Sequence, residues 1–272
     1  MNFIAKLLLL LDSKMTVPTN YGWFHLMFLA IVIVGTVLLS LKYKDCSNKT
    51  FRKILLIFWI VLLVLEIYKQ INYTFKVESG EIVADYQWYA FPFQFCSSPL
   101  YVLPFIVFLK DGKVRDSLIA FMSVFCIFGG ISVMIYPNDV FIGTIGINIQ
   151  TMVHHGSQVV LGVFCTVWYR KRFDITFRHY FKASIVFVTF IIVALVLNVI
   201  FRNLLLSMNI DETFNMFYIS PYFPCTLPLL GDLIYPNVPY IVFLLIYIIG
   251  FIFVGAIIYL AEHYIIKLSS KK

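Results

Sequence analysis

The sequence predicts an all-α polytopic membrane protein, a bundle of about seven transmembrane helices. Of its 272 residues, 61% are hydrophobic and 13% are charged, whereas soluble domains carry roughly 45–50% and about 25%. The apolar residues form long continuous runs, which favours helices over the alternating strands of a membrane β-barrel. Lys and Arg are concentrated in every second segment between these runs, as in multi-pass proteins. These observations exclude a soluble enzyme, a disordered chain and a secreted disulfide scaffold.

Each apolar run is predicted to cross the membrane as one helix. A crossing of about 30 Å of hydrocarbon needs about 20 residues, and lipid cannot satisfy the hydrogen bonds of an irregular backbone. The third run is the shortest. We expect spans at Tyr21–Leu41, Ile54–Ile71, Phe93–Leu109, Ser117–Tyr136, Ile147–Trp168, Ala183–Phe201 and Val238–Leu260.

The segments outside the spans contain no soluble domain, so residues 1–272 are expected to form a single domain. Within residues 1–20, the run Phe3–Leu11 is too short to span, and we expect an interfacial helix there. A cleaved signal peptide is the alternative, but no small-residue cleavage site follows. The segment 202–237 is predicted to be an extracytoplasmic, semi-rigid loop, because it contains Pro221, Pro224, Pro228 and Pro236.

The distribution of basic residues predicts the orientation. Cytoplasmic loops of membrane proteins carry an excess of Lys and Arg, and sixteen of the 21 lie in segments on one side of the expected topology. This places the N-terminus outside and the C-terminus in the cytoplasm of a multi-pass protein of the cell membrane. It also explains the net charge of +7 without a nucleic-acid partner. The sixteen are Lys42, Lys44, Lys49, Arg52, Lys53, Lys110, Lys113, Arg115, Arg170, Lys171, Arg172, Arg178, Lys182, Lys267, Lys271 and Lys272.

Polar side chains at membrane depth are costly, so each is a candidate functional residue. In the expected topology they all fall in the extracytoplasmic half. At 1.5 Å per residue, Cys96 lies about 5 Å below the start of its helix and His154 about 10 Å below its own, so the two can meet. Gln150, His154 and Gln158 recur every fourth residue and share one face. The candidates are Glu66, Cys96, Tyr136, Gln150, His154, His155, Gln158 and Asn198.

Structural explanations compete with catalysis for several of these residues. A cysteine in a membrane helix most often packs as a small apolar side chain. We predict this role for Cys126 and Cys165. Cys96 is open to the same explanation, and a disulfide between Cys96 and Cys225 would remove it as a nucleophile. The two adjacent histidines are equally compatible with hydrogen bonding between helices.

Two further polar residues have simple structural explanations. Glu66 and Lys69 have the i, i+3 spacing of an ion pair within one helix. His25 lies beside Tyr21 and Trp23, which is typical of the aromatic belt at a membrane interface.

Three stretches taken together resemble a known family. They are Phe91-Pro-Phe-Gln-Phe-Cys96-Ser-Ser-Pro-Leu-Tyr, Met152-Val-His154-His155-Gly156, and a late run from Asn215 to Tyr240. Their order and spacing resemble the YwaF family of bacterial integral membrane proteins, which includes the animal transmembrane protein 164. In that family the third span opens with a P-φ-[HQ]-φ-C element, where φ is apolar, and the fifth carries His-His-Gly. The resemblance covers roughly residues 50–260.

The resemblance implies a helical-bundle acyltransferase that moves a fatty acyl chain between phospholipid and lysophospholipid. Cys96 would be the nucleophile that forms a thioester, and His154 or His155 would be its base. Gln94 stands where many relatives have His, which favours hydrogen bonding there over acid–base catalysis. Phospholipids and lysophospholipids are the expected partners, with no cofactor, no metal and no nucleic acid. The expected substrate-binding residues are Gln94, Glu66, Tyr136, Gln150, Gln158 and Asn198.

Two other classes of function fit the same polar residues. One is a non-catalytic protein that binds a lipid or small molecule in an extracytoplasmic cavity. The other is a transporter, which would usually have charged residues in the middle of the membrane and helices broken in inverted repeats. The sequence has neither feature, and a nucleophile and a base on different helices at matched depth favour catalysis.

Overall fold

The computed structural model describes residues 2–137, 140–170 and 176–269. Lys171, Arg172, Lys271 and Lys272, which contribute to the predicted orientation, lie outside these residues. The described elements are α1 (Phe3–Leu11), α2 (Trp23–Tyr43), α3 (Asn48–Asn72), β1 (Phe75–Glu78), β2 (Glu81–Ala84), α4 (Ser98–Phe108), α5 (Lys113–Phe121), α6 (Ile127–Ile135), α7 (Ile145–Arg170), α8 (Phe177–Ser207) and α9 (Tyr240–Ser269).

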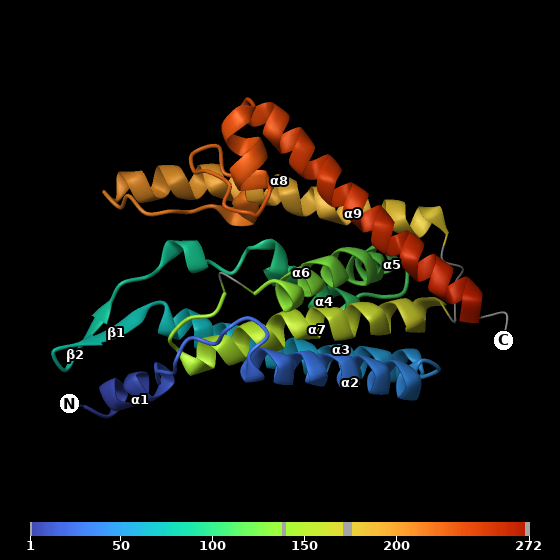
Figure 1. Cartoon of the computed structure of the whole chain (residues 1–272), viewed down its shortest axis with the longest axis horizontal. Helices are drawn as coiled ribbons and strands as arrows, with labels where there is room; N and C mark the ends of the chain where they lie inside the picture. The colour runs from blue at the N-terminus through green and yellow to red at the C-terminus, as the bar shows by residue number, and fades with distance from the viewer. Residues whose placement is uncertain (1, 138–139, 171–175, 270–272) are drawn as a thin grey trace.

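Apart from α1, the described helices form seven rods that run back and forth along the long axis of the molecule (Figure 1). A 3₁₀ turn at Phe95–Ser97 precedes α4, and a π-helical turn at Met122–Cys126 joins α5 to α6 into one rod. In Figure 1, α2 and α3 form one outer layer, α8 and α9 form the other, and α4 to α7 lie between them. The helix α1, the hairpin β1–β2 and the start of α2 lie at one end of the bundle, which we call the hairpin end.

The seven rods follow the order of the seven predicted spans, with shifted ends. Among the residues that the structure describes, five rods are both long and apolar enough to cross a membrane, and they are α2, α3, Lys113–Ile135, α8 and α9. The third rod, Phe95–Phe108, is shorter than predicted. The sixth extends to Ser207, so the predicted loop 202–237 begins only after that residue.

Helix α7 is long enough to span but carries many polar residues, and most of it is buried. It packs against α2, α3 and α6, which shield it from the surroundings of the bundle. Polar side chains are tolerated at membrane depth where neighbouring helices cover them. The fifth predicted span is therefore the central helix of the bundle.

The predicted all-α fold is confirmed, with the addition of one short β-hairpin. Strands β1 and β2 pair antiparallel, with Phe75 opposite Ala84 and Glu78 opposite Glu81. The turn residues Ser79 and Gly80 have φ of 52° and 87°, the left-handed pair that tight hairpin turns require. This hairpin follows the end of α3, where the predicted span had already ended.

The N-terminal helix α1 exists as predicted, and its interfacial position stays a prediction. The Asn2 side chain accepts a hydrogen bond from the Ala5 N–H at 2.8 Å and so caps the helix. Tyr68 of α3 donates to the Leu11 carbonyl at 2.7 Å, which ties α1 to the bundle. Phe3 and Leu10 are 78% and 68% exposed, so this apolar surface remains uncovered by the protein.

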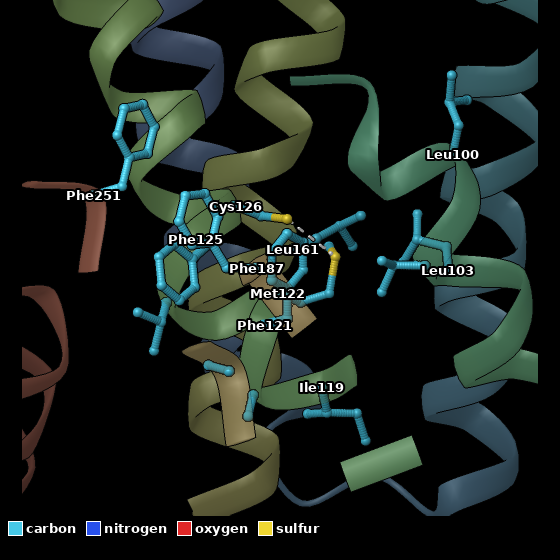
Figure 2. Packing of buried hydrophobic residues seen from close by; sticks show 14 of the residues in the cluster. Leu100, Leu103, Ile119, Phe121, Met122, Phe125, Cys126, Leu161, Phe187 and Phe251 are labelled. Atoms are coloured by element: carbon cyan, nitrogen blue, oxygen red, sulfur yellow. Dashed lines mark hydrogen bonds between the residues drawn. The ribbon is translucent and has the colours of Figure 1, made fainter. Parts of the chain in front are cut away.

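Aromatic stacking joins the outer helices α8 and α9 to the centre of the bundle (Figure 2). Phe125, in the π-helical turn, stacks on Phe187 of α8 with 4.7 Å between ring centroids. Phe187 in turn stacks on Phe251 of α9 at 5.5 Å. Cys126 and Cys165 are almost fully buried in this core, and Figure 2 shows Cys126 directed at Met122. Their predicted packing as small apolar residues is confirmed.

Prolines shape the short rod that carries Cys96. Pro104 lies inside α4 and has no N–H, so the Leu100 carbonyl loses its usual partner four residues later. The indole N–H of Trp59 on α3 donates to that carbonyl at 2.9 Å. A neighbouring helix therefore satisfies the backbone group that Pro104 leaves free.

Two arginines cap the far end of α4. Arg52 donates to the Leu109 carbonyl at 2.7 Å, and Arg115 Nε donates to the Ile106 carbonyl at 2.8 Å. Both guanidinium groups also contact Asp111 Oδ1 at 2.7 Å. Hydrogen bonding from Arg52 holds the pKa of the Asp111 carboxyl below its usual value. These cations satisfy carbonyls that a helix C-terminus leaves unpaired.

His25 is not an interface-belt residue, contrary to the prediction. It is fully buried, and its Nδ1 accepts the Tyr21 N–H at 2.9 Å. Since Nδ1 accepts, Nε2 carries the proton and donates to the Met134 carbonyl at 2.8 Å. His25 therefore links the start of α2 to the end of α6.

Glycines allow α7 to approach its neighbours closely. A Cβ at Gly130 of α6 would lie 2.7 Å from the His155 carbonyl oxygen and 2.8 Å from Val159 Cγ2. A Cβ at Gly156 of α7 would overlap with Val32 Cγ2 of α2. Small residues let membrane helices pack backbone to backbone, and here they hold α7 between α6 and α2.

Candidate functional site

The structure brings Cys96 and His154 together. Cys96 lies in the 3₁₀ turn before α4, and its carbonyl oxygen accepts hydrogen bonds from His154 Nε2 at 2.8 Å and from Gln158 Nε2 at 2.9 Å. Pro99 has no N–H to offer this carbonyl three residues later, which leaves it open to the side chains of α7. The contact runs through the backbone of Cys96, which sequence reasoning did not foresee.

Hydrogen bonds to carbonyl oxygens define the tautomers of both histidines, because a carbonyl can only accept. In neutral His154 the proton lies on Nε2, so Nδ1 carries the lone pair. His155 is opposite, since its Nδ1 bonds the Thr151 carbonyl at 2.8 Å and leaves the lone pair on Nε2. The two rings are neighbours, with centroids 5.7 Å apart.

Three buried acceptor atoms near Cys96 have no hydrogen-bond partner among the described residues. They are His154 Nδ1, Gln158 Oε1 and Glu66 Oε2. A buried polar atom without a partner costs about 1–3 kcal/mol. All three accept hydrogen bonds, so the site is suited to a group that donates them, such as a thiol, a hydroxyl, an ammonium group or water.

The predicted ion pair between Glu66 and Lys69 is confirmed, with 2.8 Å between Lys69 Nζ and Glu66 Oε1. Gln70 also donates to Glu66 Oε1 at 2.7 Å, and Tyr86 donates to Gln70 Oε1 at 2.8 Å. Burial, with the nearby charge of Glu66, raises the pKa of Tyr86 to about 12, so its hydroxyl stays a donor. The Glu66 carboxylate is buried, not at a solvated helix surface.

Lys69 belongs to the site, although we predicted only an ion pair for it. Its ammonium group interacts electrostatically with Cys96, His154 and His155. Its side chain is 17% exposed, so the charge is largely shielded from solvent. One feature of the sequence could have revealed this role of Lys69: it lies one turn after Glu66, at the same end of the bundle as Cys96.

Gln94 and Asn198 use their amides to hold the loop after α8. Gln94 Oε1 accepts the Phe217 N–H at 2.8 Å, and its Nε2 donates to the Asn215 carbonyl at 3.0 Å. Asn198 bonds both the N–H and the carbonyl of Met216, at 2.7 and 3.0 Å. These contacts support Phe217, whose φ of 59° is unfavourable for a side chain of its size. Contact of Gln94 and Asn198 with substrate stays a prediction.

The two remaining candidates are Gln150 and Tyr136. Gln150 is buried on α7, one turn from His154, where Thr151 Oγ1 lies 3.5 Å from its Oε1. Tyr136 follows the last residue of α6 and is 54% exposed. Their part in substrate binding stays a prediction.

A comparison with protein families identifies the chain. The model of the TMEM164 family matches residues 20–261, which include every element from α2 to most of α9. The chain belongs to the TMEM164 family. No curated protein and no solved structure matches it significantly.

Membership of the TMEM164 family confirms the predicted relation to transmembrane protein 164, while the relation to YwaF stays a prediction. Together with the apolar helices, it establishes a multi-pass membrane protein. The matched region includes Cys96, His154, His155 and Lys69.

Cys96 and Cys225 are both free thiols, so the disulfide considered as an alternative is not formed. In the described ranges, no group of three His, Cys, Asp or Glu side chains has the arrangement of a metal site. The chemistry of the site is that of a thiol, two imidazoles, an ion pair and several amides.

Proposed function

We propose that this member of the TMEM164 family is an acyltransferase that moves a fatty acyl chain between phospholipid and lysophospholipid. Cys96 is the nucleophile and His154 its base. One observation carries this proposal: His154 Nε2 is bonded to the Cys96 carbonyl, and His154 Nδ1 is a buried acceptor with no partner among the described residues. A base needs this combination of proximity and a free lone pair.

In the first half-reaction, His154 Nδ1 takes the proton of the Cys96 thiol. The sulfur attacks the ester carbonyl carbon of the donor phospholipid, and the bond from that carbon to the glycerol oxygen breaks. The leaving oxygen takes the proton from Nδ1, which releases lysophospholipid and leaves a thioester on Cys96. Nε2 and Nδ1 point to opposite sides of the ring, so the imidazole leaves the Cys96 carbonyl and turns before Nδ1 reaches the sulfur.

The second half-reaction returns the enzyme to its starting state. The hydroxyl of an incoming lysophospholipid gives its proton to His154 Nδ1, and its oxygen attacks the thioester carbon. The carbon–sulfur bond breaks, and the thiolate recovers the proton. A site inside the bundle limits bulk water, so transfer is favoured over hydrolysis.

The polar groups around Cys96 suit the remaining parts of a phospholipid. Lys69 offers a positive charge for the phosphate, and Glu66 Oε2 accepts a hydrogen bond from a hydroxyl or ammonium group of the head group. Gln158 shares the Cys96 carbonyl with His154 and so steadies the turn. Gln94, Tyr136, Gln150 and Asn198 complete the predicted substrate site.

The proposal includes an orientation. By the excess of basic residues, the hairpin end faces outward and the C-terminus lies in the cytoplasm. Cys96 and His154 then act in the outer leaflet of the cell membrane, where acyl chains enter sideways from lipid.

Transfer of a labelled acyl chain in liposomes tests the proposed function. Wild-type protein should convert labelled phospholipid and unlabelled lysophospholipid into newly labelled phospholipid, and Cys96→Ala should abolish this product. Cys225→Ala, which removes another free thiol, is the matched control and should keep the activity. Equal rates for wild type and Cys96→Ala would rule out the thioester route.

A second candidate function is non-catalytic binding of a polar lipid. It is favoured by the same three unpartnered acceptors, because a bound hydroxyl or ammonium group would satisfy them without any reaction. Saturable binding of lysophospholipid by a wild-type protein that transfers no label would support this alternative.

A further inference from the structure

A groove of about 600 Å³ lies between α2, α3 and α7. It runs along α2 from Phe28 to Lys42, about 21 Å at 1.5 Å per residue. Its lining is almost entirely apolar. The groove is distinct from the Cys96 site, because its lining on α7 includes Val153 and Gly156 but neither His154 nor Gln158.

Glycines explain why the groove is open between α2 and α7. At Gly156 a Cβ would overlap with Val32 of α2, so the two helices are in contact at that level. At Gly35, one turn further along α2, a Cβ would meet only Val160 Cγ2, at 3.8 Å. The missing side chain of Gly35 therefore leaves the hollow between the helices.

The groove opens toward the lipid. Ile31 and Leu38, which line it, are 55% and 62% exposed, and an exposed apolar surface on a membrane-spanning helix contacts acyl chains. One leaflet supplies about 15 Å of hydrocarbon, so the groove is long enough for an extended chain. Water is an unsuitable occupant, because buried water needs polar partners.

A positive charge marks one end of the groove. Lys42 lines it and is exposed, with its Nζ 5.4 Å from the centroid of the Tyr43 ring. Within the part of the chain that the structure describes, no carboxylate forms an ion pair with Lys42. An apolar channel that ends at an unpaired ammonium group complements an acyl chain attached to a phosphate.

We propose that this groove binds one phospholipid molecule, with an acyl chain lying on Gly35 and the phosphate beside Lys42. The lipid fills the gap between α2 and α7 that the protein leaves open. It lies behind α7, on the opposite side from His154 and Gln158. This site is independent of the chemistry proposed for Cys96.

Native mass spectrometry of the detergent-solubilised protein tests the site, with 1-palmitoyl-2-oleoyl-phosphatidylglycerol as the probe. Wild type should retain one lipid non-covalently, and Gly35→Leu should weaken its binding by at least about tenfold, because the new side chain occupies the groove. Gly250→Leu is the matched control, since a Cβ at Gly250 meets nothing within 4 Å. It should bind like wild type. Equal binding by all three proteins would overturn the proposal.

A second pair of variants tests the phosphate contact. Lys42→Gln should weaken binding of phosphatidylglycerol by about two- to fivefold, as for an exposed ion pair. Binding of the matching diacylglycerol, which lacks phosphate, should be unchanged. Lys49→Gln, a nearby exposed lysine outside the groove, should have no effect. An equal effect of both lysine variants, or displacement of the lipid by inorganic phosphate alone, would contradict a specific phospholipid site.

Discussion

The two nitrogens of the His154 ring differ in their hydrogen bonding. Nε2 donates to the Cys96 carbonyl and holds the turn that carries the proposed nucleophile, whereas Nδ1 keeps its lone pair. Helix spacing was enough to predict that Cys96 and His154 lie at similar depth. It could not predict which nitrogen is free, because that depends on the carbonyl exposed by the 3₁₀ turn before Pro99.

Amide substitutions can separate these two tasks. His154→Gln retains a donor near the position of Nε2 but provides no base, so the protein should fold while acyl transfer falls by about 10²–10⁴-fold. His155→Asn is the matched control, because its amide can replace the Nδ1 contact with the Thr151 carbonyl. It should retain most of the activity. Transfer rates and thermal midpoints in detergent measure both effects, and a His154→Gln protein with wild-type rate would exclude His154 as the base.

At the scale of elements, the packing of α7 decides where the site forms. The polar residues of α7 were visible in the sequence, and Gln150, His154 and Gln158 were predicted to share one face. The neighbours that cover them were not predictable, because the close approach of α6 and α2 depends on Gly130 and Gly156. The hairpin β1–β2 was missed for a similar reason, since a short turn signal stood next to a strongly apolar run.

A side chain that crowds the α6–α7 contact should therefore damage the site. Gly130→Ala would bring a methyl group within 2.7 Å of the His155 carbonyl, and relief of such overpacking costs about 1–3 kcal/mol. We expect a lower thermal midpoint and a slower acyl transfer, because α6 must move away from α7. Gly250→Ala should be neutral or slightly stabilising, since Ala is favoured over Gly in helices. Equal midpoints for the two variants would mean that this contact is not tight.

At the scale of the whole molecule, continuous apolar runs were sufficient to predict the seven rods and their order. Their ends were less predictable, because helices such as α8 continue beyond the apolar region. Sequence alone also assigned His25 to a membrane interface, while its partner Met134 lies on a rod more than a hundred residues away. Contacts between distant segments account for most of what the sequence did not predict.

The proposed orientation makes a prediction for the two ends of the bundle. With Cys46→Ser as background, Glu78→Cys in the hairpin should react with a membrane-impermeant maleimide on intact cells. Lys49→Cys, between α2 and α3, should react only after permeabilisation. Both positions are exposed, so accessibility reports the side of the membrane. The reverse labelling pattern would place the Cys96 site in the cytoplasmic half.

The most direct measurement is mass spectrometry of peptides from protein incubated with phospholipid. The account predicts an acyl group on the peptide that contains Cys96, removable by hydroxylamine and transferred to lysophospholipid when that acceptor is added. His154→Gln should form this thioester far more slowly. An unmodified Cys96 in a protein that still transfers acyl chains, or an acyl group that the acceptor cannot remove, would contradict the account.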